Sequence, residues 1–65
     1  MNPMELRYKI FTLLSRANER DGSVFDRMEL VPPVNGEPLT IALESPDPYS
    51  KPGAIRKYRV TVEEV

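Results

Sequence analysis

The sequence predicts a single α+β domain over residues 1–65, in which an N-terminal α-helix packs on one face of a three-stranded antiparallel β-meander. Two observations predict this fold. Apolar residues recur at helical spacing up to Gly22, and they alternate with polar residues in three later segments. Six of the seven prolines lie between Pro32 and Pro52, where they separate the alternating segments. Sequential strands with short connections favour antiparallel neighbours, which gives the order α-β-β-β.

The first element is a helix over residues 3–20. Asn2 suits the N-cap, Pro3 suits the first helical position, and Glu5 is placed to return a hydrogen bond to the cap amide. Gly22 ends the helix, because glycine accepts the left-handed conformation that follows a last turn. At about 100° per residue, the face expected to meet the sheet is formed by Leu6, Ile10, Leu13, Leu14 and Ala17.

Three strands are expected, over residues 24–31, 38–44 and 54–63. The Asn35-Gly36 pair predicts a tight turn between the first two strands, and the prolines beside it should stop the ladder short of the turn. Asp26 is the weak point, because strict alternation turns its side chain towards the core unless a bulge turns it outwards. The strand residues expected in the core are Met28, Leu30, Leu39, Ile41, Leu43, Tyr58, Val60 and Val62.

The composition argues against catalysis. The chain has no histidine and no cysteine, so it lacks the commonest general base and the thiol nucleophile. Its glycines are isolated, which excludes a glycine-rich phosphate loop, and so short a chain has little room for a substrate pocket. Glu63 and Glu64 are adjacent and point to opposite faces of a strand, which argues against a shared metal ion. We therefore expect no enzyme activity, no metal and no cofactor.

Charge and hydropathy favour a cytoplasmic protein with no membrane partner. Nine Lys+Arg against ten Asp+Glu give a net charge of −1, short of the basic excess of dedicated nucleic-acid-binding proteins. The absence of cysteine is compatible with a reducing compartment. Glu5, Arg7 and Lys9 interrupt the N-terminal apolar run, and no stretch approaches the ~18 apolar residues of a membrane helix.

A second apolar strip lies beside the predicted core face of the helix and makes that face wider than one narrow sheet covers. Arg7 and Asn18 border this strip, as a polar rim would. A surplus apolar strip favours either additional core or a partner surface. Tyr49, in the proline-rich second connection, is a further candidate contact, because tyrosine is favoured at binding surfaces. The candidate partner-binding residues are Met4, Tyr8, Phe11 and Tyr49.

These features predict a small non-enzymatic protein–protein interaction module, such as an accessory subunit, an adaptor or an inhibitor. Its partner is expected to be another protein or a second copy of the chain, bound through the helix strip, the Pro/Tyr loop or an edge strand. Lys57 and Arg59 would guard an edge formed by the last strand. A further hypothesis is a self-associating protein that completes its core by dimerisation.

The alternative from another class is a single-stranded nucleic-acid-binding accessory protein that uses the open face of the sheet. An aromatic side chain among basic ones on a bare sheet suits the stacking of unpaired bases. Pairing of the basic residues with Glu29 across the strands would neutralise this face and argues against the alternative. The candidate nucleic-acid-binding residues are Phe25, Arg27, Lys57 and Arg59.

Overall fold

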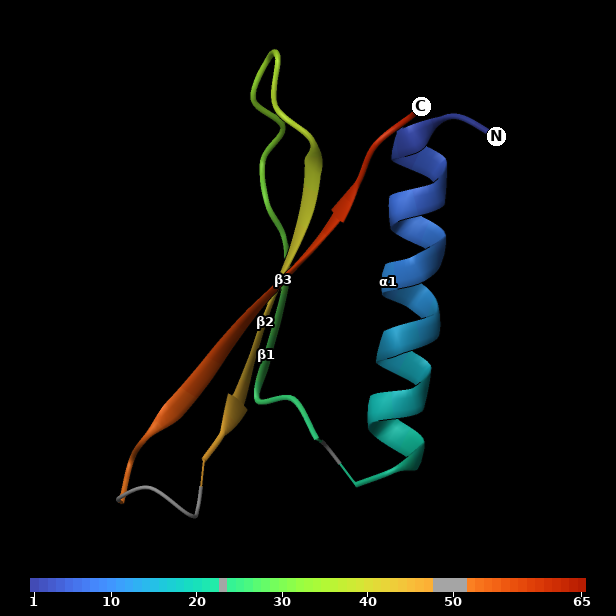
Figure 1. Ribbon diagram of the computed structural model, residues 1–65. Coiled ribbons are helices and arrows are strands. Elements are labelled where there is room, and N and C mark those ends of the chain that lie inside the picture. The colour runs from blue at the N-terminus through green and yellow to red at the C-terminus, as the bar shows by residue number, and fades with distance from the viewer. Residues whose placement is uncertain (23, 48–51) are drawn as a thin grey trace.

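The computed structural model describes residues 1–22, 24–47 and 52–65, and within these ranges it contains one helix and three strands (Figure 1). The strands form one antiparallel sheet in the order β1-β2-β3, and α1 lies along one side of it, with its most extensive contacts on β2. The predicted fold class is therefore confirmed. The elements are α1 (Pro3–Arg20), β1 (Arg27–Leu30), β2 (Leu39–Pro46) and β3 (Ile55–Val62).

The helix begins and ends at the predicted residues. The Glu5 amide donates to Asn2 Oδ1 at 2.9 Å. The return bond runs from Asn2 Nδ2 to Glu5 Oε1, also at 2.9 Å, so Glu5 reaches the side-chain amide of the cap rather than its backbone amide. At the other end the Asp21 amide donates to the Ala17 carbonyl, and Gly22 takes a φ of +84°.

β1 is shorter than predicted because the ladder changes at Asp26. Arg27 is registered opposite Glu44, and the Asp26 amide also donates to the Glu44 carbonyl, at 2.9 Å. Two residues thus oppose one, which is the arrangement of a β-bulge. Asp26 is exposed, so the bulge removes the conflict that strict alternation created. β2, by contrast, runs two residues further than predicted, to Pro46.

The hydrogen-bond pattern decides which backbone groups of the sheet point away from it. In an antiparallel pair, every second residue exchanges both of its bonds with the residue opposite. The Asp47 amide donates to the Ala54 carbonyl at 2.9 Å, and these two residues lie one step beyond the Pro46–Ile55 pair. The even-numbered residues of β3 therefore bond to β2, and its odd-numbered residues direct their N–H and C=O groups outwards.

The helix face that meets the sheet matches the predicted one in part: Ile10, Leu14 and Ala17 are half-buried as expected, but two leucines are not. Leu6 and Leu13, predicted in the core, are 41% and 57% exposed, and Tyr58 is 49% exposed. Tyr58 belongs to the first half of β3, which diverges from α1 in Figure 1. The buried apolar residues of the described chain are Ile41, Leu43 and Val62. The half-buried ones around them include Ile10, Phe11, Leu14, Ala17, Met28, Leu30, Leu39 and Val60.

Arg7 explains the orientation of the helix. It is only 5% exposed, and its Nη1 donates to the Val31 carbonyl at 2.7 Å and to the Thr40 carbonyl at 3.0 Å. Val31 and Thr40 also bond to each other, so the guanidinium lies at the last rung of the β1–β2 ladder. Hydrogen bonds from a charged donor are stronger than neutral ones. Arg7 therefore turns towards the sheet, and the helix positions of Leu6 and Leu13 are left partly uncovered.

Replacement of Arg7 by methionine should destabilise the fold by about 2–3 kcal/mol, because it removes charge-assisted bonds and leaves part-buried carbonyls without this donor. Urea unfolding followed by circular dichroism measures the change. The matched control is Arg16→Met on an exposed helix position, with an expected change within about 0.5 kcal/mol. Equal losses in the two variants would contradict the role of Arg7.

Candidate functional site

The outer edge of β3 is the longest strand edge without a neighbouring strand in the described part of the chain. β3 has eight residues and β1 has four, while β2 is paired on both sides. Every residue of β3 except Val60 and Val62 is exposed. An exposed edge of this kind is a template for pairing with another strand.

Charge is divided along this edge. The first five residues of β3 include Arg56, Lys57 and Arg59, and the strand contains no acidic residue. Glu63 and Glu64 follow directly after it. Within the described residues, neither of these two carboxylates forms an ion pair. The edge is therefore basic where β3 begins and acidic just beyond its end.

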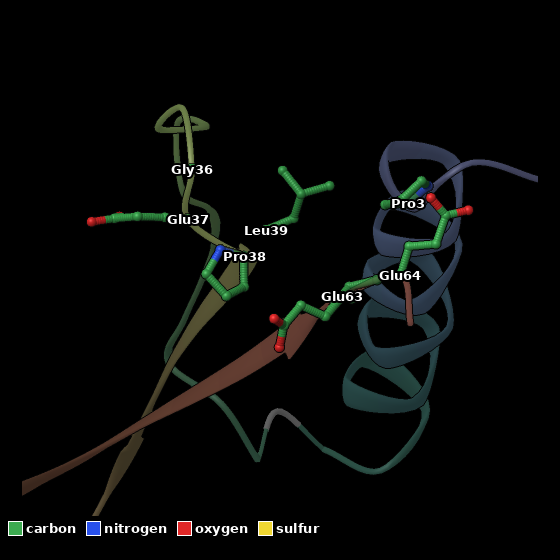
Figure 2. Close-up of a pocket in the computed structure, with 8 residues that line it drawn as sticks. Pro3, Gly36, Glu37, Pro38, Leu39, Glu63 and Glu64 are labelled. Atoms are coloured by element: carbon green, nitrogen blue, oxygen red, sulfur yellow. The ribbon is translucent and has the colours of Figure 1, made fainter.

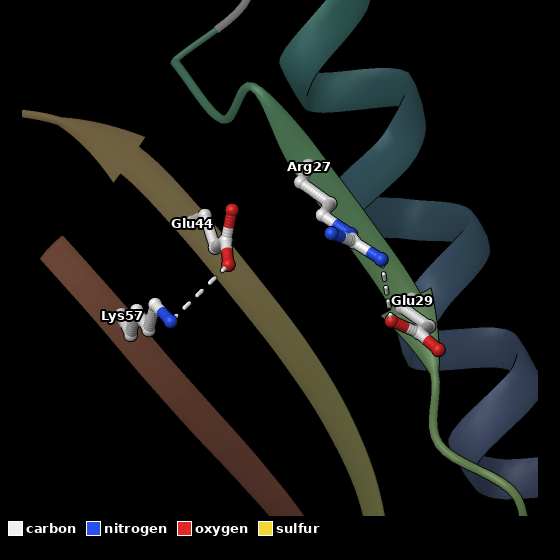
Figure 3. A network of polar contacts seen from close by, with 4 residues as sticks. All are labelled: Arg27, Glu29, Glu44 and Lys57. Carbon is white, nitrogen blue, oxygen red and sulfur yellow. Dashed lines mark hydrogen bonds and ion pairs between the residues drawn. The ribbon is translucent and has the colours of Figure 1, made fainter. Parts of the chain in front are cut away.

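Three of the four predicted nucleic-acid-binding residues share the open face of the sheet, where carboxylates lie between them. The registers place Arg27 and Lys57 on either side of Glu44, and Arg59 follows on the same face of β3. Figure 3 shows two ion pairs on this face: Lys57 Nζ lies 3.9 Å from Glu44 Oε1, and Arg27 Nη2 lies 3.5 Å from Glu29 Oε2. Ion pairs at the surface add little stability, but these two reduce the positive potential of the face.

The fourth residue, Phe25, precedes β1 and is held by the helix. Its amide donates to Asn18 Oδ1 at 2.7 Å, and Asn18 Nδ2 donates to its carbonyl at 3.0 Å. The sheet ladder therefore does not place the Phe25 ring among the cations. Asn18 and Arg7 both attach α1 to the segment around β1, so the prediction that they form a polar rim around a partner strip is wrong.

The predicted helix strip divides between the surface and the interface with the sheet. Met4 and Tyr8 are 50% and 64% exposed, whereas Phe11 is half-buried. Tyr49, the remaining predicted contact, lies outside the described residues. On the outward face of α1, Tyr8 and Leu13 border a shallow hollow of about 390 Å³, whose other lining residues are Met1, Glu5, Lys9, Thr12 and Arg16.

A second hollow, of about 300 Å³, lies between the start of α1, the β1–β2 connection and the end of β3 (Figure 2). In Figure 2 the side chains of Glu37, Glu63 and Glu64 extend in different directions and do not converge. In the described part of the chain, no group of three or more acidic, histidine or cysteine side chains is arranged to hold a metal ion. The carboxylates at this hollow make its rim acidic.

One partly buried ion pair holds the start of β3 to the end of β2. Arg56 Nε lies 3.0 Å from Asp47 Oδ2, and the side chain of Asp47 is only 10% exposed. Hydrogen bonds to Asp47 and then to Tyr58 raise the pKa of Arg56 above its ordinary value. This pair braces the end of the β2–β3 hairpin, next to the basic half of the edge.

No protein-family model, curated protein or solved structure matches this chain. None of the described residues forms a helix with the length and hydropathy of a membrane span. The function of this chain is therefore inferred from its own surfaces.

The carboxylates on the open face should suppress binding to nucleic acid, which gives a test of the alternative function. The double variant Glu29→Gln/Glu44→Gln should bind a single-stranded oligonucleotide several-fold more tightly than the wild type at low salt, with an affinity that falls as salt rises. Fluorescence anisotropy measures both. The control Glu5→Gln/Glu19→Gln makes the same change in net charge on the helix and should leave binding unchanged. A wild type that binds as tightly as the sheet variant would contradict this expectation.

Proposed function

We propose that this chain is a small non-enzymatic interaction module, acting as an accessory subunit, adaptor or inhibitor, that binds another protein through the outward face of α1. The observation that carries the proposal is the exposure of large apolar side chains on that face. Tyr8 and Leu13 are 64% and 57% exposed, and they border the same shallow hollow. A tyrosine and a leucine beside a concave surface are typical anchors of a protein interface.

The attachment of α1 to the sheet supports this proposal. Arg7 and Asn18 bond to backbone groups of the segment around β1, at opposite ends of the helix. Tyr8 and Leu13 cannot turn inwards unless these bonds break. Glu5, Lys9 and Arg16 line the same hollow and would provide the polar rim that surrounds the apolar centre of an interface.

Composition supports binding rather than chemistry, because the chain lacks both histidine and cysteine. The lack of cysteine is also in line with a reducing compartment, and we include a cytoplasmic location in the proposal. The nucleic-acid alternative has less support, because Glu29 and Glu44 lie among the cations of the open face.

The test is a pull-down from native lysate with the tagged chain, followed by quantitative mass spectrometry. Tyr8→Ser and Leu13→Ser should each reduce recovery of the same partner by about tenfold, as expected for the loss of an interface anchor. The matched control is Val34→Ser, which removes another exposed apolar side chain (56% exposed) in the β1–β2 connection, outside the hollow that Tyr8 and Leu13 border. A partner that all three variants retain equally, or no partner specific to the wild type, would refute the proposal.

A further inference from the structure

The segment from Ile55 to Val65 is complementary to itself when two copies run antiparallel about Val60. Two of the three basic residues before Val60 then meet acidic residues at the same distance on the other side, and the third meets a threonine. Apolar residues meet apolar ones. The resulting pairs are Ile55–Val65, Arg56–Glu64, Lys57–Glu63, Tyr58–Val62 and Arg59–Thr61, with Val60 opposite itself.

The residues of β3 that this pairing joins by hydrogen bonds are the ones whose N–H and C=O groups point outwards. Hydrogen-bonded rungs between two edges form only between residues whose N–H and C=O groups point outwards. Those are the odd-numbered residues, because the even-numbered ones already bond to β2. Pairing about Val60 places Lys57 opposite Glu63 and Arg59 opposite Thr61, so every hydrogen-bonded rung joins two outward-facing residues.

We propose that two copies of the chain join through the outer edges of β3 into a two-fold symmetric dimer with a continuous six-stranded antiparallel sheet. In this dimer Lys57 of each copy lies opposite Glu63 of the other. The same edge is used on both copies, so the contact closes at two chains and does not grow into a fibre. The dimer leaves the outward face of α1 free. The dimer and the proposed function therefore use different surfaces, and each can be tested without the other.

The dimer covers apolar side chains that the single chain exposes. Ile55 is 55% exposed and Tyr58 is 49% exposed, and each meets a valine of the second copy. Leu6, 41% exposed, lines a small hollow with Val62 at the end of the edge. Tyr58 of the second copy, opposite Val62, approaches Leu6 there. The dimer thus explains why the side of α1 next to β3 carries an uncovered leucine.

Charge selects this register over its neighbours, since like charges directly opposite each other destabilise a sheet. A shift of the strands by one hydrogen-bonded rung is a shift by two residues. In one direction, a shift of one rung places Arg59 opposite Arg59, and a shift of two rungs places Lys57 opposite Arg59. Moving them by one rung in the other direction pairs Arg59 with Glu63 but places Tyr58 opposite Glu64. The register about Val60 is the one that pairs both Arg56 and Lys57 with carboxylates.

Sedimentation velocity over a dilution series tests the dimer with charge-reversed variants. The wild type should move from one to two chains as concentration rises. Lys57→Glu alone and Glu63→Lys alone should each weaken association by at least about tenfold, because each creates two like-charged pairs in the dimer. An equimolar mixture of these two variants should associate again as a heterodimer, and so should the double variant with itself. Lys9→Glu and Glu19→Lys are exposed controls with the same changes in charge, and they should leave association unchanged.

Disulfide trapping provides a second measurement. Val60 bonds to β2, so across the edge it faces its own copy at a non-hydrogen-bonded position, where opposite Cα atoms lie about 4.5 Å apart. This separation is within the range of a disulfide. Because the chain has no natural cysteine, Val60→Cys should oxidise to a linked dimer, whereas Arg16→Cys on the helix should not.

Three results would overturn the dimer. A wild type that is monomeric at all concentrations would show that the β3 edge does not pair with itself. Association that charge reversal does not weaken, or that the mixture of Lys57→Glu and Glu63→Lys does not restore, would show a different interface. A mass that rises beyond two chains would show an open contact instead of a closed one.

Discussion

The buried guanidinium of Arg7 determines how much of the sheet one helix covers. It bonds to two carbonyls at the last rung of the β1–β2 ladder, and near the other end of α1 the side chain of Asn18 bonds to both backbone groups of Phe25. These contacts attach the helix to β1 and β2. α1 lies mainly over β2, while the first half of β3 diverges from it (Figure 1).

This arrangement leaves the domain with a small core and much exposed apolar surface. Ile41, Leu43 and Val62 are buried, and a chain of this length buries only about 60% of the surface that its unfolded form exposes. Covering one large apolar side chain stabilises a structure by about 1.5–3 kcal/mol. Contacts with another molecule at Leu6, Tyr8, Leu13 or Tyr58 would therefore add a large fraction of the stability that a small domain has.

The parts of this fold that depend on local chemistry can be predicted from the sequence. Asn2, Pro3 and Gly22 define the helix ends, and alternation places Lys57 and Arg59 on the open face. The helix face is predictable only in part: apolar spacing also favours Leu6 and Leu13, which are exposed, because the bonds of Arg7 that orient the helix join residues 24 and 33 positions apart. The self-complementary charges of β3 are visible in the sequence. The outward direction of its odd-numbered residues requires the ladder register, which sequence alone does not provide.

Amide hydrogen exchange along β3, measured by NMR at two protein concentrations, tests most directly whether this uncovered edge pairs with itself. The amides of Tyr58 and Val60 bond to β2 and should be protected at both concentrations. The outward amides of Lys57, Arg59 and Thr61 should exchange freely in dilute solution and become at least about tenfold slower when the chain is concentrated, because only the dimer covers them. Outward amides that exchange freely at both concentrations would contradict the pairing of β3 edges.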